Sequence, residues 1–77
     1  NFTNWVGAIR SCLDEAGLGP ADERRAIAEL VLTVMEGGVM QARTYRDMGH
    51  FDRAVAQLRN YLDRLEKARP IRRRKRT

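Results

Sequence analysis

The sequence has one cysteine, one histidine and two prolines among its 77 residues. With Cys12 as the only thiol, no disulfide can form within the chain. One cysteine and one histidine also fall short of the usual zinc ligand sets. A single core in a chain of this size gives about 3–5 kcal/mol of net stability, which small proteins supplement with a disulfide, a metal or a partner. We therefore expect association with another chain.

The sequence patterns of catalytic centres are missing as well. There is no HExxH, no glycine-rich phosphate loop, no GxSxG and no CxxC. Cys12 falls on an apolar helical face, where we expect a buried small side chain, and His50 suits a turn or capping role. Glu36 falls on the polar stripe of a helix, which favours a solvated or ion-paired carboxylate. The sequence predicts a protein that is not an enzyme and uses no cofactor.

Long apolar runs are absent too. No run approaches the ~18–20 residues needed to cross a bilayer, and no signal-peptide pattern is present. We expect no membrane partner and a cytoplasmic location. The chain begins with Asn1 and not with methionine, so we expect residue 1 to result from cleavage or from the choice of chain boundaries, and whether the chain is part of a longer protein stays open.

Acidic residues are missing from the C-terminal end of the chain. Residues 1–66 hold eight basic and ten acidic side chains (8 − 10 = −2), whereas residues 67–77 hold seven basic and no acidic ones (+7). Five consecutive cations occur after a proline: Arg72, Arg73, Arg74, Lys75 and Arg76. We expect residues 70–77 to be a mobile tail that is either simply solvated or in contact with nucleic-acid phosphates. No aromatic residue lies between these cations to stack on bases.

Residues 2–16 predict a first helix. Its apolar side chains recur at alternating steps of four and three residues. Asn1 or Thr3 can cap the start of the helix. Gly17 is well placed as the left-handed residue at its end, and Leu18 follows it as in a Schellman motif.

Residues 20–46 predict a second, long helix with Pro20 at its first position. Its apolar side chains cover roughly twice the ~100° stripe of an ordinary surface helix. One seam comprises Ile27, Leu30, Val31, Val34, Gly38, Ala42 and Tyr45, and a second comprises Ala28, Leu32, Met35, Val39 and Ala42. Gly37 and Gly38 predict a bend or the close approach of another backbone, and the seams stay in phase past them, which favours close approach. Neighbouring helices must therefore bury the apolar surface of this helix on two sides.

Residues 50–67 predict a third helix with a single apolar stripe, which we expect to lie on the second helix. Pro70 stops it. With no strand pattern in the sequence, we predict an all-α fold: a three-helix antiparallel unit over residues 1–69. A second copy of the chain is expected to supply the cover that the second helix needs, making a homodimer.

The segment VMEGGVMQAR, from Val34 to Arg43, resembles the C-terminal end of TetR-type transcriptional repressors. Many members have a long penultimate helix with a Glu-Gly pair at mid-length and an Ala-Arg pair a few residues later, followed by a short turn and a final amphipathic helix. A helix that ends in Ala-Gly-Leu before a proline-containing turn, as in EAGLGP at residues 15–20, is similar to that family too. The resemblance covers about residues 2–66.

The resemblance implies that the last two helices of each subunit form a four-helix dimer interface. It also implies a parent protein that binds operator DNA and a small-molecule effector, although the family's helix-turn-helix is absent from this chain. The residues expected at the interface are Leu30, Val34, Gly38, Tyr45, Phe51, Val55, Leu58 and Leu62. Which seam of the second helix faces the partner is left open.

Trp5, Met35, Met40 and Met48 are candidates for lining an apolar ligand pocket, with Trp5 and Met35 on one wall, because methionine side chains repack around varied ligands. The alternative for each is ordinary core filling.

Two other functions stay open at this point. The chain can be a small helical adaptor that binds another protein through the same apolar faces. It can also be a small nucleic-acid-binding protein that acts through its basic tail, with an affinity that falls steeply with salt.

Overall fold

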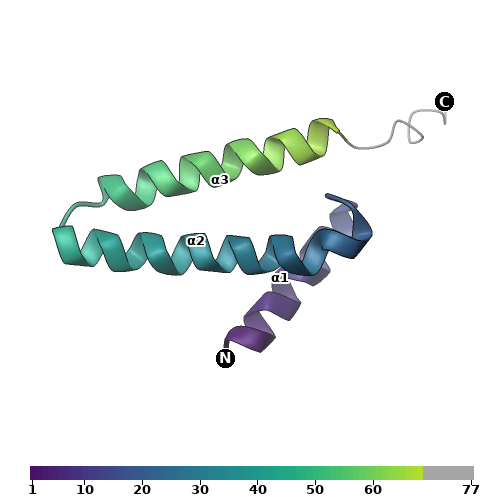
Figure 1. The fold of residues 1–77 in the computed structure, drawn as a ribbon, viewed down its shortest axis with the longest axis horizontal. Helices are drawn as coiled ribbons and strands as arrows, with labels where there is room; N and C mark the ends of the chain where they lie inside the picture. The colour runs from purple at the N-terminus through teal and green to yellow at the C-terminus, as the bar shows by residue number, and fades with distance from the viewer. Residues whose placement is uncertain (69–77) are drawn as a thin grey trace.

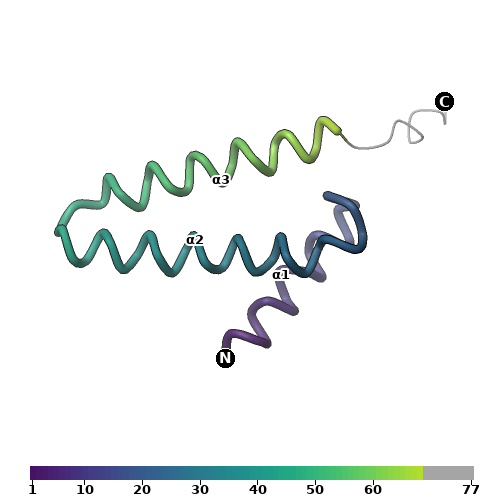
Figure 2. The backbone as a smooth tube through the Cα atoms, viewed as in Figure 1, coloured from purple at the N-terminus to yellow at the C-terminus, as the bar shows by residue number. Residues whose placement is uncertain are grey.

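The computed structural model describes residues 1–68, which form three helices and no strand (Figure 1). Helix α1 spans Phe2–Ala16, α2 spans Arg24–Tyr45 and α3 spans Gly49–Lys67. Helices α2 and α3 lie side by side and antiparallel, whereas α1 packs across the N-terminal part of α2 at a steep angle (Figure 2). The prediction of an all-α fold is confirmed.

The two ends of α1 are capped as the sequence predicts. The Asn1 side chain accepts a hydrogen bond from the Asn4 amide at 3.0 Å. Gly17 adopts the left-handed conformation (φ 64°, ψ 33°), which costs glycine little because it has no Cβ. The Leu18 amide then donates to the Leu13 carbonyl at 3.0 Å, the long hydrogen bond of a Schellman motif.

Helix α2 begins later than predicted. Pro20 is extended (φ −63°, ψ 136°) and precedes a 3₁₀ turn, Ala21–Glu23, so the α-helix starts at Arg24. The Glu23 amide donates to the Pro20 carbonyl at 2.9 Å, which closes this turn. Proline at the start of a tighter 3₁₀ turn loses no hydrogen bond, so the pattern that suits an α-helix start suits this turn equally well.

The turn between α2 and α3 is held by local hydrogen bonds. Arg46 takes the left-handed conformation (φ 53°), and the Asp47 amide donates to the Ala42 carbonyl at 3.0 Å. The Asp47 carboxylate accepts from the Gly49 amide at 2.9 Å, which places α3 one residue ahead of its predicted start. These contacts reverse the chain within three residues of the end of α2.

The core lies where all three helices meet. It consists of Val6 and Leu13 from α1 with Ile27 and Ala28 from α2. Half-buried side chains from neighbouring segments pack against it: Ile9, Leu18, Leu32, Tyr61, Leu62 and Leu65. No large side chain among residues 1–68 is completely buried. The core is therefore small.

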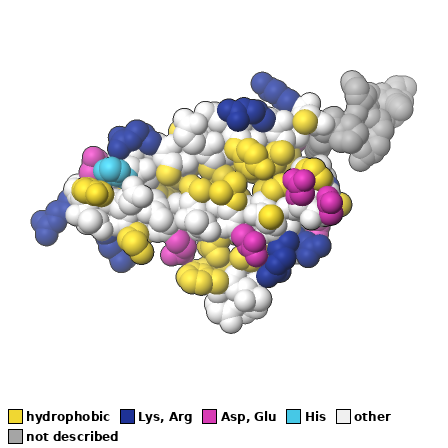
Figure 3. Space-filling view, viewed as in Figure 1, with side chains coloured by type: hydrophobic (Ala, Val, Ile, Leu, Met, Phe, Trp, Pro, Cys, Tyr) yellow, Lys and Arg dark blue, Asp and Glu magenta, His cyan; other side chains and the backbone are white. Residues whose placement is uncertain are grey.

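The molecule is long and thin. Its extents are 50 × 25 × 15 Å and its radius of gyration is 14.7 Å, against roughly 11 Å for a compact domain of this length. Several large apolar side chains are exposed to solvent: Phe2, Trp5, Leu30, Met35, Val39, Met40, Tyr45 and Met48. Figure 3 shows hydrophobic side chains exposed along the line where α2 and α3 meet. One chain does not cover its own apolar surface.

Candidate functional site

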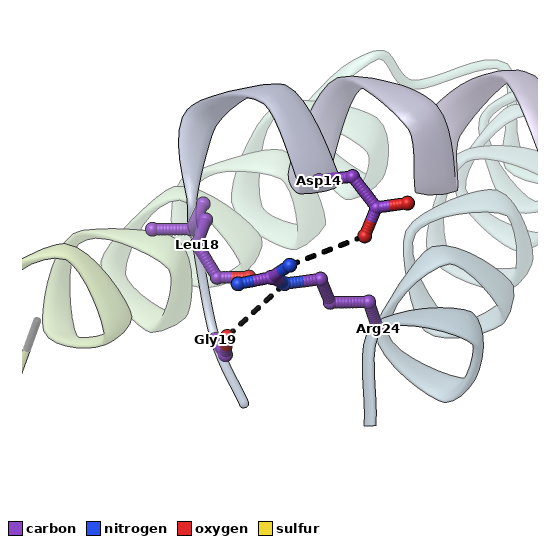
Figure 4. A network of polar contacts seen from close by, with 4 residues as sticks. All are labelled: Asp14, Leu18, Gly19 and Arg24. Atoms are coloured by element: carbon purple, nitrogen blue, oxygen red, sulfur yellow. Dashed lines mark hydrogen bonds and ion pairs between the residues drawn. The ribbon is translucent and has the colours of Figure 1, made fainter. Parts of the chain in front are cut away.

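The side chain of Arg24 fixes the junction between α1 and α2 (Figure 4). Its Nε donates to the carbonyl oxygens of Leu18 and Gly19, each at 3.1 Å, and its Nη1 donates to Asp14 Oδ1 at 3.2 Å. The Arg24 side chain is 17% exposed, so these hydrogen bonds are partly shielded from solvent. This network ties the end of α1 to the start of α2.

Close packing reinforces the same junction. Gly19 has φ 78°, and a Cβ there would lie 2.7 Å from the Cδ1 of Ile27. Any other residue would strain the backbone, and the Ile27 side chain would have to move to make room for its Cβ. Held at this one end, α1 diverges from α2 toward its own N-terminus.

A cleft of about 660 Å³ opens where the two helices diverge. Its walls are Phe2, Thr3 and Val6 from α1 and Arg25, Glu29, Leu32, Thr33, Glu36, Gly37 and Met40 from α2. Val6 is buried and Leu32 is half-buried, so both form the apolar floor, whereas the three charged side chains are exposed at the rim. This volume lies within the range of roughly 300–1,000 Å³ typical of small-molecule sites.

The charges on the rim do not balance. Arg25 Nε lies 3.4 Å from Glu29 Oε2, an i,i+4 pair whose side chains are both about half exposed. Such surface pairs contribute only about 0.3–0.5 kcal/mol. No ion pair or side-chain hydrogen bond engages Glu36 within residues 1–68. One cation and two carboxylates leave the cleft with a formal charge of −1 (1 − 2).

Of the candidate pocket residues, Met40 lines this cleft, whereas Trp5 and Met35 lie beside it and do not line it. Trp5 packs edge-to-face on Phe2, with ring centroids 5.6 Å apart, and Phe2 is a lining residue. Met35 is exposed on α2 outside the cleft. The polar stripe of α2 on which Glu36 was expected to be solvated or ion-paired forms part of the wall. This role of the stripe depends on the angle at which α1 crosses α2, which the sequence pattern does not give.

The predicted interface residues divide into two groups. Gly38, Leu58 and Leu62 pack within the chain: the first two are buried, and Leu62 lies against the core. At position 38 a Cβ would lie 3.1 Å from the Phe51 Cδ1. The close approach expected at this glycine does occur, and it is made by α3 of the same chain.

The remaining predicted interface residues are at least partly accessible. Leu30 and Tyr45 are exposed, and Val34, Phe51 and Val55 are half-buried. Tyr45 also stacks on His50, with ring centroids 4.7 Å apart and planes at 24°. A second, smaller groove of about 320 Å³ lies near the turn between α2 and α3, lined by Val39, Ala42, Arg43, Met48 and Phe51.

The sequence pattern predicts a buried Cys12 side chain, and this prediction is wrong. Cys12 is exposed and not buried. Helix α1 touches mainly one neighbour, so only the narrow stripe of Val6 and Leu13 is covered. Within residues 1–68 no three His, Cys, Asp or Glu side chains converge on a place that could hold a metal ion.

The predicted absence of a membrane span can be compared with the structure over residues 1–68, and the predicted basic tail cannot. Over residues 1–68, none of the helices combines the length and hydropathy that a membrane span requires. The predicted tail, residues 70–77, and its candidate phosphate contacts at residues 72–76 lie outside the described residues.

A family model described as "Transcriptional regulator LmrA/YxaF-like, C-terminal domain" matches residues 1–57. The match spans α1, α2 and the first half of α3. No curated protein and no solved structure matches the chain.

Proposed function

Because the chain belongs to the LmrA/YxaF-like C-terminal domains of TetR-type transcriptional regulators, we propose that it is a dimerisation and ligand-sensing region. Membership of this family points to a non-enzymatic role in transcription regulation. We propose further that the longer protein binds operator DNA and a small-molecule effector. The repressor role and the cytoplasmic location belong to the same proposal.

The observation that carries the dimerisation proposal is the uncovered apolar surface of α2. Leu30, Val34 and Tyr45 share one side of this helix and are exposed or half-buried. At 100° per residue they lie away from Ala28 and Leu32, which belong to the core around α1. Leu30 and Val34 are neighbours one helical turn apart, and accessible apolar surface of this kind is typical of an interface.

A second copy that places its own α2 on this side would complete a four-helix bundle, in which α2 and α3 of each chain take part. The contact would centre on Leu30, Val34 and Tyr45. The packing of α2 on α3 would support this contact, through Gly38, Leu58 and Leu62. Helix α3 would add partly exposed apolar area, from Phe51 and Val55.

The test is the mass of the chain in solution, measured by light scattering at micromolar concentration. We expect twice the chain mass for the wild type. Leu30→Glu places a charge in the proposed contact and should give the mass of one chain with unchanged helix content. Met40→Glu is the matched control, because it also puts a charge in place of an exposed apolar side chain of α2, on the side of the cleft.

A wild-type protein that stays monomeric, or a Leu30→Glu variant that stays dimeric, would contradict the proposed interface. A monomer that gains mass only with a different protein would favour the adaptor function instead.

The cleft between α1 and α2 supports the ligand-sensing part of the proposal. It combines an apolar floor with a few polar groups at the rim, the usual composition of a small-molecule site. One side of helix α2 lines the cleft, and another side carries Leu30 and Val34 of the proposed dimer contact. A ligand that repositions α2 would therefore act on the dimer contact directly.

A further inference from the structure

Among residues 1–68, no packing contact requires glycine at position 37. A Cβ at this position would meet nothing within 4 Å, whereas one at Gly38 would press on Phe51. Glycine in mid-helix is destabilising relative to alanine. Gly37 does line the cleft, so the missing side chain leaves room there for an occupant.

The charge of the cleft indicates what kind of occupant fits. Glu36 adjoins Gly37 on the cleft wall and is engaged by no ion pair within residues 1–68, while Glu29 is held by Arg25 alone. A cation entering the cleft would meet a free carboxylate and gain its attraction, and an anion would be repelled by it.

Aromatic and apolar surface lies on the opposite wall. Phe2 lines the cleft and is 60% exposed, with Trp5 packed edge-to-face against it. A cation is attracted to the face of an aromatic ring, most strongly where water is partly excluded. Val6, Leu32 and Met40 offer apolar contact to the remainder of a ligand.

We propose that this cleft binds an organic cation with an apolar body, with Glu36 as the charge-selecting residue and Gly37 as the residue that admits the ligand. The proposal rests on the ligand-sensing function proposed above and names the chemical class of its ligand. The positive group lies between Glu36 and Phe2, and the apolar body lies on the floor of the cleft.

The probes are two ions of nearly the same shape and opposite charge, tetraphenylphosphonium and tetraphenylborate, titrated separately in sodium buffer. Trp5 is the only tryptophan in the chain and lies against a lining residue, so its fluorescence reports occupancy. We expect tetraphenylphosphonium to bind with a saturable change and tetraphenylborate to bind more weakly.

Two matched pairs of variants locate the site. Glu36→Gln should weaken cation binding by about fivefold, the effect of one partly solvated charge pair, and bring the two probes closer in affinity. Glu15→Gln removes an exposed carboxylate of α1 outside the cleft and should change neither. Gly37→Leu fills the cleft and should abolish binding of both probes. Gly7→Leu, at a glycine that also has open space around it but does not line the cleft, should leave binding unchanged.

Three outcomes would overturn the proposal: no binding of the cation, equal affinity for both probes, or a Glu36→Gln variant that still prefers the cation as strongly as the wild type. If tetraphenylborate binds in the cleft as well as the cation does, ligand sensing stands and the charge selection fails. The dimer mass is a separate measurement, so its failure removes the dimerisation proposal without touching this one.

Discussion

The two halves of α2 both carry apolar side chains, and their surroundings differ. In its N-terminal half, α1 and α3 both pack on the helix, and Ile27 and Ala28 are 3% and 0% exposed. In its C-terminal half α3 packs over Gly38 and α1 faces the helix across the cleft, and Val39 and Met40 are 43% and 67% exposed. The comparison teaches that burial along this helix depends on what lies opposite and not on the hydrophobicity of its own residues.

The polar contacts differ between the two halves in the same way. At the N-terminal half, Arg24 bonds to groups five to ten residues away in the sequence. At the C-terminal half, Asp47 bonds within its own turn. The three-helix end is therefore held by tertiary contacts of its own, whereas the two-helix end leaves apolar surface for another molecule to cover.

The comparison predicts the largest loss of stability at the covered end. Ile27→Ala should destabilise the chain by about 2–5 kcal/mol, because it removes a buried side chain from a core too small to close over the cavity. Met35→Ala, on the uncovered half of the same helix, should cost less than about 1 kcal/mol. Thermal denaturation followed by circular dichroism, at one fixed protein concentration, measures both. Equal losses would contradict the contrast between the two halves.

The Arg24 network predicts an intermediate effect. Arg24→Met keeps most of the aliphatic stem but leaves the carbonyls of Leu18 and Gly19 without their donor, at a cost of about 1–3 kcal/mol. Asp14→Asn weakens only the more exposed ion pair and should cost less than about 1 kcal/mol. Urea denaturation gives both values. A larger loss for Asp14→Asn would show that the ion pair, and not the carbonyl contacts, holds the junction.

The smallest effect is a gain. Gly37→Ala should raise stability by about 1 kcal/mol, since its methyl group meets open space and alanine favours the helix. Gly38→Ala gains the same propensity but presses its methyl group on Phe51, so it should gain less or lose stability. Thermal denaturation of the two variants under identical conditions ranks them. A greater gain at position 38 would mean that α3 moves aside easily.

Most of the fold could be predicted from local patterns. Steps of three and four residues placed all three helices, and the Gly17-Leu18 pair marked the end of α1, because these signals act within a few residues. The start of α2 was missed because Pro20 suits both an α-helix and a 3₁₀ turn. Cys12 was misplaced because a helical wheel shows which face is apolar and not how much of it a neighbour covers.

The candidate site was less predictable for the same reason. The stripe through Arg25, Glu29 and Glu36 looks like a solvated face in sequence, and becomes a cleft wall when α1 lies across it. Gly38 could be recognised as a point of close approach, but its partner, Phe51, follows from the antiparallel placement of α3.

By itself the sequence determined the three helices, the caps of α1 and the excess of apolar surface on α2, since each depends on residues near one another in the chain. Only the tertiary structure decided which parts of that surface are covered. The angle of α1, held by Arg24 and Gly19, opens a cleft on one side of α2, and α3 closes over Gly38 on another side. Both follow from contacts between residues far apart in the sequence, whose combined geometry no local pattern records.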